Sequence, residues 1–395
     1  MKAVEVKPGI YWVGAKDFLV RDFHGYRTQR GSTYNSFLIV DEKVTLIDTV
    51  KAPFTDEMLA RISSIIPLEK IDYVVANHAE MDHSGALPQL MKKIPHATLV
   101  TSPNGEATLK KHFDMRDWKI QTVRTGQSIS LGKRSLHFVQ VPFVHWPDSM
   151  VTWCPEEKIL FSNDAFGQHI APNALFDDET PRCVVLEEAA KYYANIVLPF
   201  ANQVDKAIEA VRPLNPDIIC PSHGVIWRSR VPEILGEYTK WCKGVNDGSA
   251  LIVYDSMWES TTKMAETIRG FFEAKGIPVR FCSLKSDHIS DVMTSVLTAK
   301  YIAIGTPVLN ENMMPTMAGF LTYMRGLKPR NKIGLVFGSY GWNFRLHKEI
   351  EGSLKALEWK MPVAAQSIKY VPTAEELSVL ESSLENMLTF DCSLI

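Results

Sequence analysis

The first part of the chain alternates short apolar runs with polar turns, and this pattern predicts strands followed by a helix. Runs rich in β-branched and aromatic residues predict short strands at 10–13, 34–40 and 44–50. Residues 55–66 instead place Met58, Ile62 and Ile66 at helical spacing, with acidic residues in the first turn and Pro67 beyond the end. An apolar run at 71–76 predicts a buried strand.

The same pattern continues to about residue 220. Helices are predicted up to 93 and up to 113, with a strand at 98–101 between them. Further strands are predicted at 120–123, 128–131, 135–141, 150–154, 158–161 and 217–220, and helices near 187–198 and 201–211. This order of elements is typical of an α/β sandwich with sheets inside and helices outside.

The second part of the chain has a different pattern, which begins after a Gly- and Asp-containing linker at 244–249. Apolar strands are predicted at 250–255, 301–305 and 333–338, each leading into a polar loop, and a closing helix begins with a capping box at Thr373. Five strands alternating with helices predict a doubly wound parallel sheet, whose ligand binds at the carboxyl ends of the strands. We therefore expect two domains, residues 1–247 and 248–395.

Composition narrows the class of protein. The 395 residues carry a formal net charge of −2, which gives no electrostatic reason to expect nucleic acid or a membrane surface as a partner. The six cysteines include no Cys-x-x-Cys pair, which argues against a disulfide framework, a zinc ribbon and an iron–sulfur cluster. The N-terminus lacks the apolar core of a signal peptide, and no apolar run approaches membrane-spanning length. We expect a soluble, cytoplasmic protein.

Candidate chemistry is concentrated in the loop at 77–85, directly after the predicted strand at 71–76. Several side chains that bind metals or protons stand within a few residues here, and burying them unpaired would be costly. Three more candidates follow predicted strands further along the chain. The full set is four histidines and three carboxylates: His78, Glu80, Asp82, His83, His145, Asp164 and His223. Their repeated position at strand ends predicts one shared site.

This pattern resembles the metallo-β-lactamase superfamily, whose commonest loop reads His-x-His-x-Asp-His. Glu80 stands where the hydrolases of that superfamily carry the second histidine. Zinc hydrolases favour neutral imidazoles, whereas oxygen donors favour iron or manganese. The flavodiiron proteins are the branch with His-x-Glu-x-Asp-His, and the run Val-His-Trp-Pro-Asp-Ser-Met at 144–150 also resembles their motif.

The resemblance implies two iron ions per chain. His78, Glu80 and His145 would hold one iron, and Asp82, His83 and His223 the other, with Asp164 bridging the two. His24 and His169 are expected to be catalytic residues beside the irons or in the substrate pocket. The alternative for each of these two is a surface loop histidine.

The second domain resembles flavodoxin, which implies FMN. The hydroxyl-rich loop 256–261 lies between a strand and a helix N-terminus, as a phosphate site does, although a capped helix looks similar. It lacks the lysine expected where a phosphate is transferred. The cofactor contacts implied are Ser256, Met257, Trp258, Ser260, Thr261, Pro307, Leu309, Asn310, Ser339, Tyr340, Gly341 and Trp342. Asn343-Phe344-Arg345 departs from the smaller residues expected there, and would either change the flavin potential or donor surface or only begin a helix.

The function implied by the resemblance is reduction of dioxygen to water, of nitric oxide to nitrous oxide, or both, with electrons delivered through FMN. The family arrangement is a head-to-tail homodimer, or a dimer of dimers, which would put Trp146 near a partner subunit's flavin. Because the chain ends at Ile395 without a fused electron-transfer module, we expect a separate donor, either rubredoxin or a reduced deazaflavin coenzyme. The alternatives are a zinc hydrolase with an accessory flavodoxin domain and a redox sensor or electron carrier.

Overall fold

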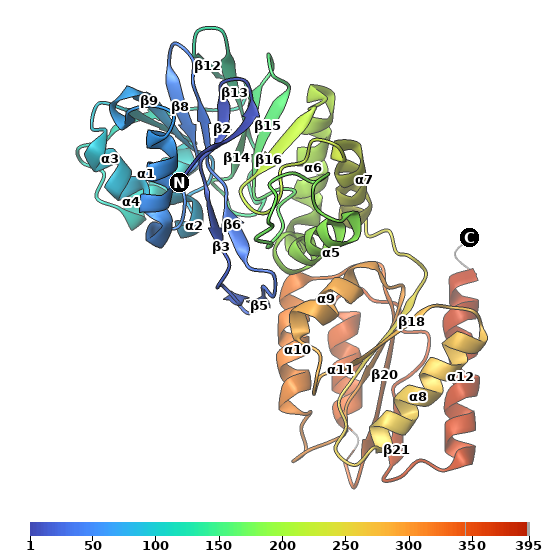
Figure 1. Cartoon of the computed structure of the whole chain (residues 1–395). Coiled ribbons are helices and arrows are strands. Elements are labelled where there is room, and N and C mark those ends of the chain that lie inside the picture. Colours follow the sequence, from blue (N-terminus) through green and yellow to red (C-terminus); the bar gives the residue numbers. More distant parts are fainter. Residues whose placement is uncertain (344, 393–395) are drawn as a thin grey trace. The chain divides into compact units, whose positions relative to one another are not determined.

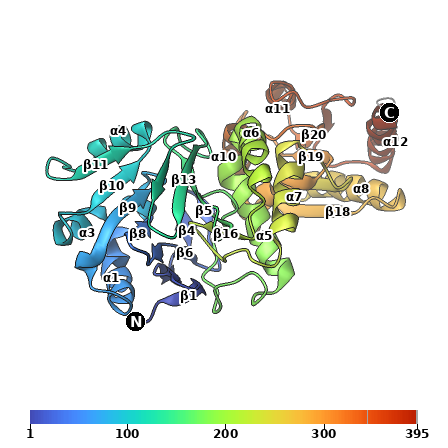
Figure 2. The same cartoon turned by 90° about the horizontal axis from the view of Figure 1, so that it is seen from above.

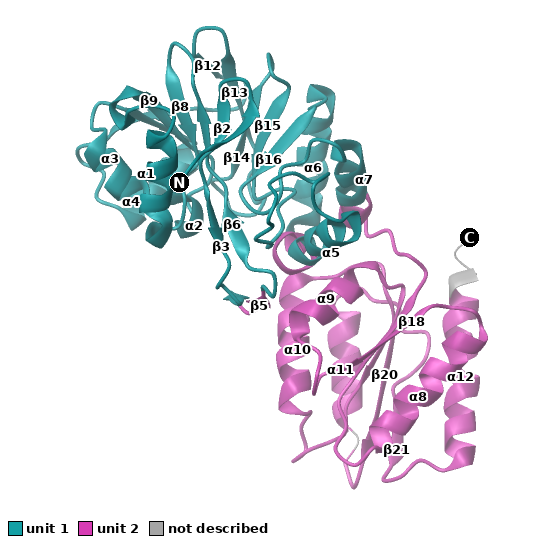
Figure 3. Cartoon of the chain, viewed as in Figure 1, with its two compact units in different colours: residues 1–24, 28–193, 200–239 teal, residues 25–27, 194–199, 240–395 magenta. Residues whose placement is uncertain are grey.

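The chain divides into two compact units (Figures 1 and 3). The structure is a computed structural model that describes residues 1–343 and 345–392. Unit 1 comprises residues 1–24, 28–193 and 200–239, and unit 2 comprises residues 25–27, 194–199 and 240–395. The linker expected at 244–249 therefore lies within unit 2, and the domain limits 1–247 and 248–395 stay a prediction. Phe344, singled out from the sequence, lies outside the described residues.

Unit 1 is built on two sheets. The first has seven strands in the order β1 (Val4–Lys7), β2 (Ile10–Trp12), β7 (Phe37–Ile39), β8 (Val44–Ile47), β9 (Ile71–Ala76), β10 (Thr98–Thr101) and β11 (Lys119–Thr122). The second has five strands in the order β12 (Ser128–Ser130), β13 (Ser135–Gln140), β14 (Met150–Cys154), β15 (Ile159–Asn163) and β16 (Ile218–Pro221). The parallel pairs β8–β9, β9–β10 and β15–β16 bring strand carboxyl ends together at one edge of each sheet.

Helices cover the outer faces of these sheets, as the sequence predicts (Figures 1 and 2). The seven-stranded sheet carries α1 (Thr55–Ser63), α3 (Leu87–Lys93) and α4 (Pro103–His112), whose apolar residues join one buried cluster with the strands. A second cluster, with Trp12, Phe37, Phe138 and Phe161, fills the space between the two sheets. The five-stranded sheet is flanked by α5 (Arg182–Tyr192), α6 (Ala201–Val211) and α7 (Val231–Cys242). The result is an αββα sandwich.

Two details within residues 1–200 differ from the prediction. The prediction misses β1 and four strands of two or three residues, because such strands are too short to show a period: β3 (Ala15–Asp17), β4 (Asp22–Phe23), β5 (Tyr26–Arg27) and β6 (Ser32–Tyr34). The helix predicted near 187–198 was wrong at both ends. α5 begins directly after Pro181, which suits a helix start, and the chain turns π-helical over Tyr193–Val197.

Unit 2 has a five-stranded sheet in the order β18 (Val279–Ser283), β17 (Ala250–Tyr254), β19 (Tyr301–Gly305), β20 (Ile333–Tyr340) and β21 (Gln366–Lys369), with every pairing parallel. Its helices are α8 (Ser260–Ala274), α9 (Ile289–Thr298), α10 (Pro315–Leu327), α11 (Arg345–Lys355) and α12 (Ala374–Cys392). Figure 1 shows α8 and α12 on one face and α9 and α10 on the other. The strand order reverses at β17, so the loops after β17 and β19 diverge and leave room for a ligand.

Within residues 1–343 and 345–392, none of the helices combines the length and apolar character needed to cross a membrane.

Candidate functional site

The predicted metal ligands of unit 1 stand at the ends of strands from both sheets. His78 and Glu80 lie in the connection between β9 and the short helix α2 (Met81–Ser84), which carries Asp82 and His83. His145 lies between β13 and β14, Asp164 directly follows β15, and His223 follows β16. The structure brings all seven side chains together in two neighbouring groups.

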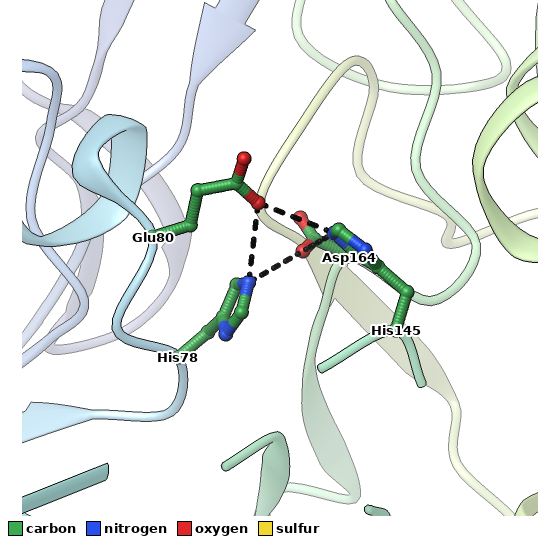
Figure 4. A group of neighbouring side chains, drawn as sticks. All are labelled: His78, Glu80, His145 and Asp164. Carbon is green, nitrogen blue, oxygen red and sulfur yellow. Dashed lines mark hydrogen bonds and ion pairs between the residues drawn. The ribbon is translucent and has the colours of Figure 1, made fainter. Parts of the chain in front are cut away.

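The first group comprises His78, Glu80, His145 and Asp164, whose nearest nitrogen and oxygen atoms all lie within 4.8 Å of one another (Figure 4). Glu80 Oε2 lies 3.3 Å from His78 Nε2 and 3.3 Å from His145 Nε2. Asp164 Oδ2 lies 3.5 Å from His78 Nε2 and 3.3 Å from His145 Nε2. Two imidazole nitrogens and two carboxylate oxygens therefore face a common point.

The second group comprises Asp82, His83 and His223. Asp82 Oδ1 lies 3.3 Å from His83 Nε2, and Asp82 Oδ2 lies 3.1 Å from His223 Nε2. The other oxygen of Asp164, Oδ1, lies 3.0 Å from His83 Nε2 and 3.6 Å from His223 Nε2. Asp164 thus presents one oxygen to each group, which is the geometry required of a bridging ligand.

The spacing of these atoms fits a metal ion in each group. Nitrogen and oxygen ligands that bind one ion at about 2.1 Å lie roughly 3.0–3.4 Å apart, close to the distances found here. Both oxygens of Asp82 and of Asp164 are buried and have no hydrogen-bond partner among the described residues. Because a buried carboxylate is costly unless a positive charge lies beside it, the two groups are suited to hold cations.

Electrostatics within the metal-free cluster are dominated by histidine–carboxylate pairs. Burial lowers the pKa of His78, but its hydrogen bonds with Asp148 and Glu80 outweigh burial and raise that pKa to about 10. Burial also lowers the pKa of His83, but the carboxylates of Asp82 and Asp164 outweigh burial and raise that pKa to about 9. Burial works against ionisation of Asp164, yet the histidines, His83 foremost, hold its pKa well below the usual range. Protons on the imidazoles therefore occupy the positions that metal ions would take.

Neighbouring groups orient two of the histidines. Asp148 Oδ2 lies 3.0 Å from His78 Nδ1 and accepts a hydrogen bond from the Ala79 main-chain N–H at 2.7 Å. His223 Nδ1 lies 2.6 Å from the main-chain oxygen of Thr33. A carbonyl oxygen only accepts, so His223 Nδ1 carries the proton and Nε2 presents its lone pair to the second group. Asp148 was missed in the sequence analysis, although it stands three residues after His145.

His24 and His169 occupy very different environments. His24 Nε2 lies 3.2 Å from Glu80 Oε1, and its side chain is 75% exposed. His169 is fully buried, with Nδ1 2.8 Å from Ser32 Oγ and its ring 4.7 Å from that of His223. The surface alternative is therefore wrong for His169. Burial, with His223 close by, lowers the pKa of His169 well below its usual value and keeps the ring neutral.

Unit 2 contains a cleft of about 450 Å³ at the carboxyl ends of its strands, within the usual size range of small-molecule sites. Ten of the twelve predicted cofactor contacts line it: Met257, Trp258, Ser260, Pro307, Leu309, Asn310, Ser339, Tyr340, Gly341 and Trp342. The cleft is also lined by Asn343, which the sequence analysis had singled out, and by four residues that it missed: Val308, Glu311, Tyr370 and Val371. Tyr370 and Val371 directly follow β21. Because the carboxyl ends of parallel strands meet at one edge of a sheet, this position could have predicted both contacts.

The two remaining predicted contacts, Ser256 and Thr261, are buried. Ser256 Oγ has no hydrogen-bond partner among the described residues, so its hydroxyl is available to donate a hydrogen bond to a ligand oxygen. Thr261 Oγ1 lies 3.0 Å from Ser339 Oγ, which ties the N-terminus of α8 to β20. Trp258 and Trp342 at the cleft are 89% and 80% exposed. A phosphate group would fit the Ser256 end and a flat ring the aromatic end.

Comparison with known proteins covers both units. Residues 33–224 match the family described as ODP family beta lactamase, and residues 252–380 match flavodoxin. A nitric oxide reductase of Moorella thermoacetica is 42% identical, with 95% of each chain covered. The structure of rubredoxin oxygen:oxidoreductase from Desulfovibrio gigas superposes with a TM-score of 0.97 at 39% identity, covering 100% of both chains. That of the flavodiiron protein from Giardia intestinalis gives 0.95 at 36%, covering 99% of this chain and 98% of the other.

Proposed function

This chain belongs to the flavodiiron proteins, and we propose that it reduces dioxygen to water, nitric oxide to nitrous oxide, or both. The observation that carries the proposal is the carboxylate of Glu80, which faces His78 and His145 where a zinc hydrolase of this superfamily would present an imidazole. Together with Asp82 and Asp164 it gives the cluster three oxygen-donating residues. Oxygen donors suit iron, which is redox-active, better than zinc, which is not.

The residues of unit 1 are suited to hold two irons, which when bound would supply the redox chemistry of the gas reduction. His78, Glu80 and His145 would hold one iron, Asp82, His83 and His223 the other, and Asp164 would bridge them. The role of this chain is to present these seven groups in a fixed arrangement. Asp148 fixes the ring of His78, and the Thr33 carbonyl fixes the ring of His223.

Both reductions consume protons, so the site needs a proton route from solvent. His24 is placed to serve as one, because its side chain is largely exposed and its Nε2 lies 3.2 Å from Glu80 Oε1. His169 is buried and neutral, with Ser32 Oγ against its Nδ1, and is suited to keep its ring beside His223 rather than to exchange protons with solvent. His24 is therefore the stronger candidate for a catalytic proton carrier.

Electrons would enter through FMN bound to unit 2. Its phosphate would be held by the loop before α8 and the first turn of that helix: Ser256, Trp258, Ser260 and Thr261. The cleft residues from the β19 and β20 loops would contact the ring. Flavin exchanges one or two electrons, which suits a donor of single electrons and an acceptor that needs two or four.

We also propose the setting in which the protein works. A head-to-tail homodimer is supported by the exposure of Trp258 and Trp342 beside the cleft, since large exposed aromatics mark contact surfaces. A cytoplasmic location is supported by the cysteine pattern of the sequence, whose six scattered cysteines include no Cys-x-x-Cys pair. The electron donor would be rubredoxin or a reduced deazaflavin coenzyme. The name rubredoxin oxygen:oxidoreductase of the Desulfovibrio gigas relative favours the former.

Anaerobic stopped-flow oxidation of the reduced protein, after a count of iron and FMN, tests the proposal. We expect two irons and one FMN per chain, with rapid reoxidation of the flavin by at least one of the two gases tested separately. Asp164→Ala is the matched control, because it removes the oxygens that face both groups and leaves unit 2 intact. Zinc in place of iron would point to a hydrolase, and slow reoxidation by both gases at full iron loading would point to an electron carrier.

A further inference from the structure

Unit 1 contains a small internal cavity that the metal site does not use. It has a volume of about 20 Å³ and lies between helix α6 and the five-stranded sheet. The sheet side is formed by Val141, Val151 and Leu160, on or next to β13, β14 and β15. The helix side is formed by residues at helical spacing on one face of α6: Val204, Ala207, Ile208 and Val211. This helix flanks the sheet in Figure 1.

The cavity directly adjoins the backbone that carries two of the candidate metal ligands. Val144, which lines it, immediately precedes His145, and Ala165, which also lines it, immediately follows Asp164. One peptide unit therefore separates each lining residue from a ligand. The cavity therefore adjoins the same two loop segments that carry His145 and Asp164.

The lining is almost entirely apolar. Among the described residues that form it, the only hydroxyl belongs to Tyr238, and its oxygen already accepts a hydrogen bond from the Phe166 main-chain N–H at 2.8 Å. A buried water needs about 10–15 Å³ and two to four polar partners, so the cavity has the room for one small molecule but not the partners for water. Cavities of this kind stay dry and take up small apolar molecules.

The cavity also approaches the surface at one point. Val204, Ile208 and Val211 are buried, whereas Ala207 on the same face of α6 is only partly buried. Its methyl group is the smallest side chain that α6 contributes to the lining. A small molecule would therefore pass most easily beside Ala207.

From this placement we propose that the cavity is a docking site for one apolar diatomic gas, which enters beside Ala207 and waits next to the segments that carry His145 and Asp164. This inference rests on the proposed function and adds to it a binding site for the substrate class. The site raises the local concentration of gas at the centre, and its walls exclude competing water.

Xenon tests the binding site without any dependence on turnover. Crystals of the iron- and FMN-loaded protein would be pressurised with xenon, whose anomalous scattering locates it. We expect a xenon atom within the space bounded by Val144, Ala165 and Ile208. An Ile208→Val variant, with a larger cavity, should raise its occupancy. A protein without xenon at this place at saturating pressure would overturn the proposal.

Gas kinetics test whether the site supplies the metal centre. Ala207→Leu fills the cavity, and we expect the second-order rate constant for reoxidation at limiting gas to fall about tenfold, the enrichment that apolar surroundings give a small apolar solute. The rate at saturating gas and the iron and FMN content should not change. Ala210→Leu is the matched control, since it places the same side chain on the exposed face of α6. Ala207→Val, which adds less volume, should give an intermediate loss and covers the case in which the leucine variant does not fold.

The outcomes separate this inference from the proposed function. An unchanged rate constant in Ala207→Leu, with or without xenon in the wild-type cavity, would overturn the docking site while leaving the gas reductase intact. A xenon atom in a protein that neither gas reoxidises would instead refute the proposed function and support the cavity as a site for small apolar molecules.

Discussion

Asp148→Asn offers a stringent test of the metal site. The substitution replaces one carboxylate oxygen by an NH2 group, and His78 is the only candidate metal ligand to which the Asp148 side chain is hydrogen-bonded among the described residues. Asp148 Oδ2 serves both His78 Nδ1 and the Ala79 N–H, while its Oδ1 is buried without a partner among the described residues. If the amide oxygen of the new side chain takes the place of Oδ2, its NH2 group is buried without an acceptor. If the amide is flipped, the NH2 group faces His78 Nδ1 and forces the proton onto Nε2, the atom needed for the metal.

Either orientation carries a cost that can be estimated. An orphaned buried donor lowers the free energy of unfolding by about 1–3 kcal/mol. Loss of the carboxylate that orients a metal-binding histidine lowers metal affinity by about 10- to 100-fold, which corresponds to about 1.4–2.7 kcal/mol. The direct effect should fall on the step that fills the His78 group, since the hydrogen bonds of the Asp148 carboxylate go to His78 and Ala79.

The assay is anaerobic titration with ferrous iron against a competing chelator, combined with thermal unfolding of the metal-free protein. Asp177→Asn is the control, because Asp177 is also buried and accepts main-chain N–H groups, from Arg228, Ser229 and Arg230, away from the cluster. It should lose stability and keep its metal affinity. Unchanged iron affinity in Asp148→Asn, or an equal loss in Asp177→Asn, would refute the reasoning.

Three further outcomes are expected. Glu80→His removes an oxygen donor, so the ratio of zinc to iron retained in a mixed-metal competition should rise, as measured by elemental analysis; an unchanged ratio would contradict the role given to Glu80. The pKa of His78 is raised from 6.5 to about 10, so its protonated form stabilises the metal-free fold below about pH 6.5 and that contribution is lost as the pH rises toward 10. Because a metal must displace this proton, the rise in melting temperature on adding metal should grow between pH 6 and 9, and a shift independent of pH would count against it. Ser256→Ala should leave the FMN-free protein as stable as before but weaken FMN binding by about 10- to 100-fold in a fluorescence titration, since a hydrogen bond to a charged phosphate is lost.

The positions of the candidate ligands were predictable because each one follows a strand that an apolar run in the sequence predicts. Asp164 comes directly after β15 and His223 two residues after β16, and the apolar runs of both strands are clear. Parallel pairing of these two strands then brings their carboxyl ends together, so ligands separated by almost sixty residues meet. Pattern alone was enough to place them near one another.

Contacts that depend on the exact path of loops were not predictable. Asp148 reaches His78 across a gap of 70 residues, and no local pattern indicates which ring its carboxylate will meet. Tyr370 enters the cofactor cleft from a turn with a positive φ of 57°, a conformation that bulky residues rarely adopt and that propensity does not foretell. The cavity behind α6 depends on the volumes left by Ala165 and Ala207 against opposite walls, which only packing in three dimensions reveals.

The two oxygens of Asp164 have a consequence for how the protein acquires its metals. Because each oxygen faces a different group, the first ion to bind fixes the carboxylate in the orientation that the second ion needs. The same ion also places positive charge next to the other group of ligands, and this charge repels the second ion. Loading is therefore one thermodynamically coupled process rather than two independent equilibria, and the sign of its coupling free energy decides whether cells ever contain a half-loaded form.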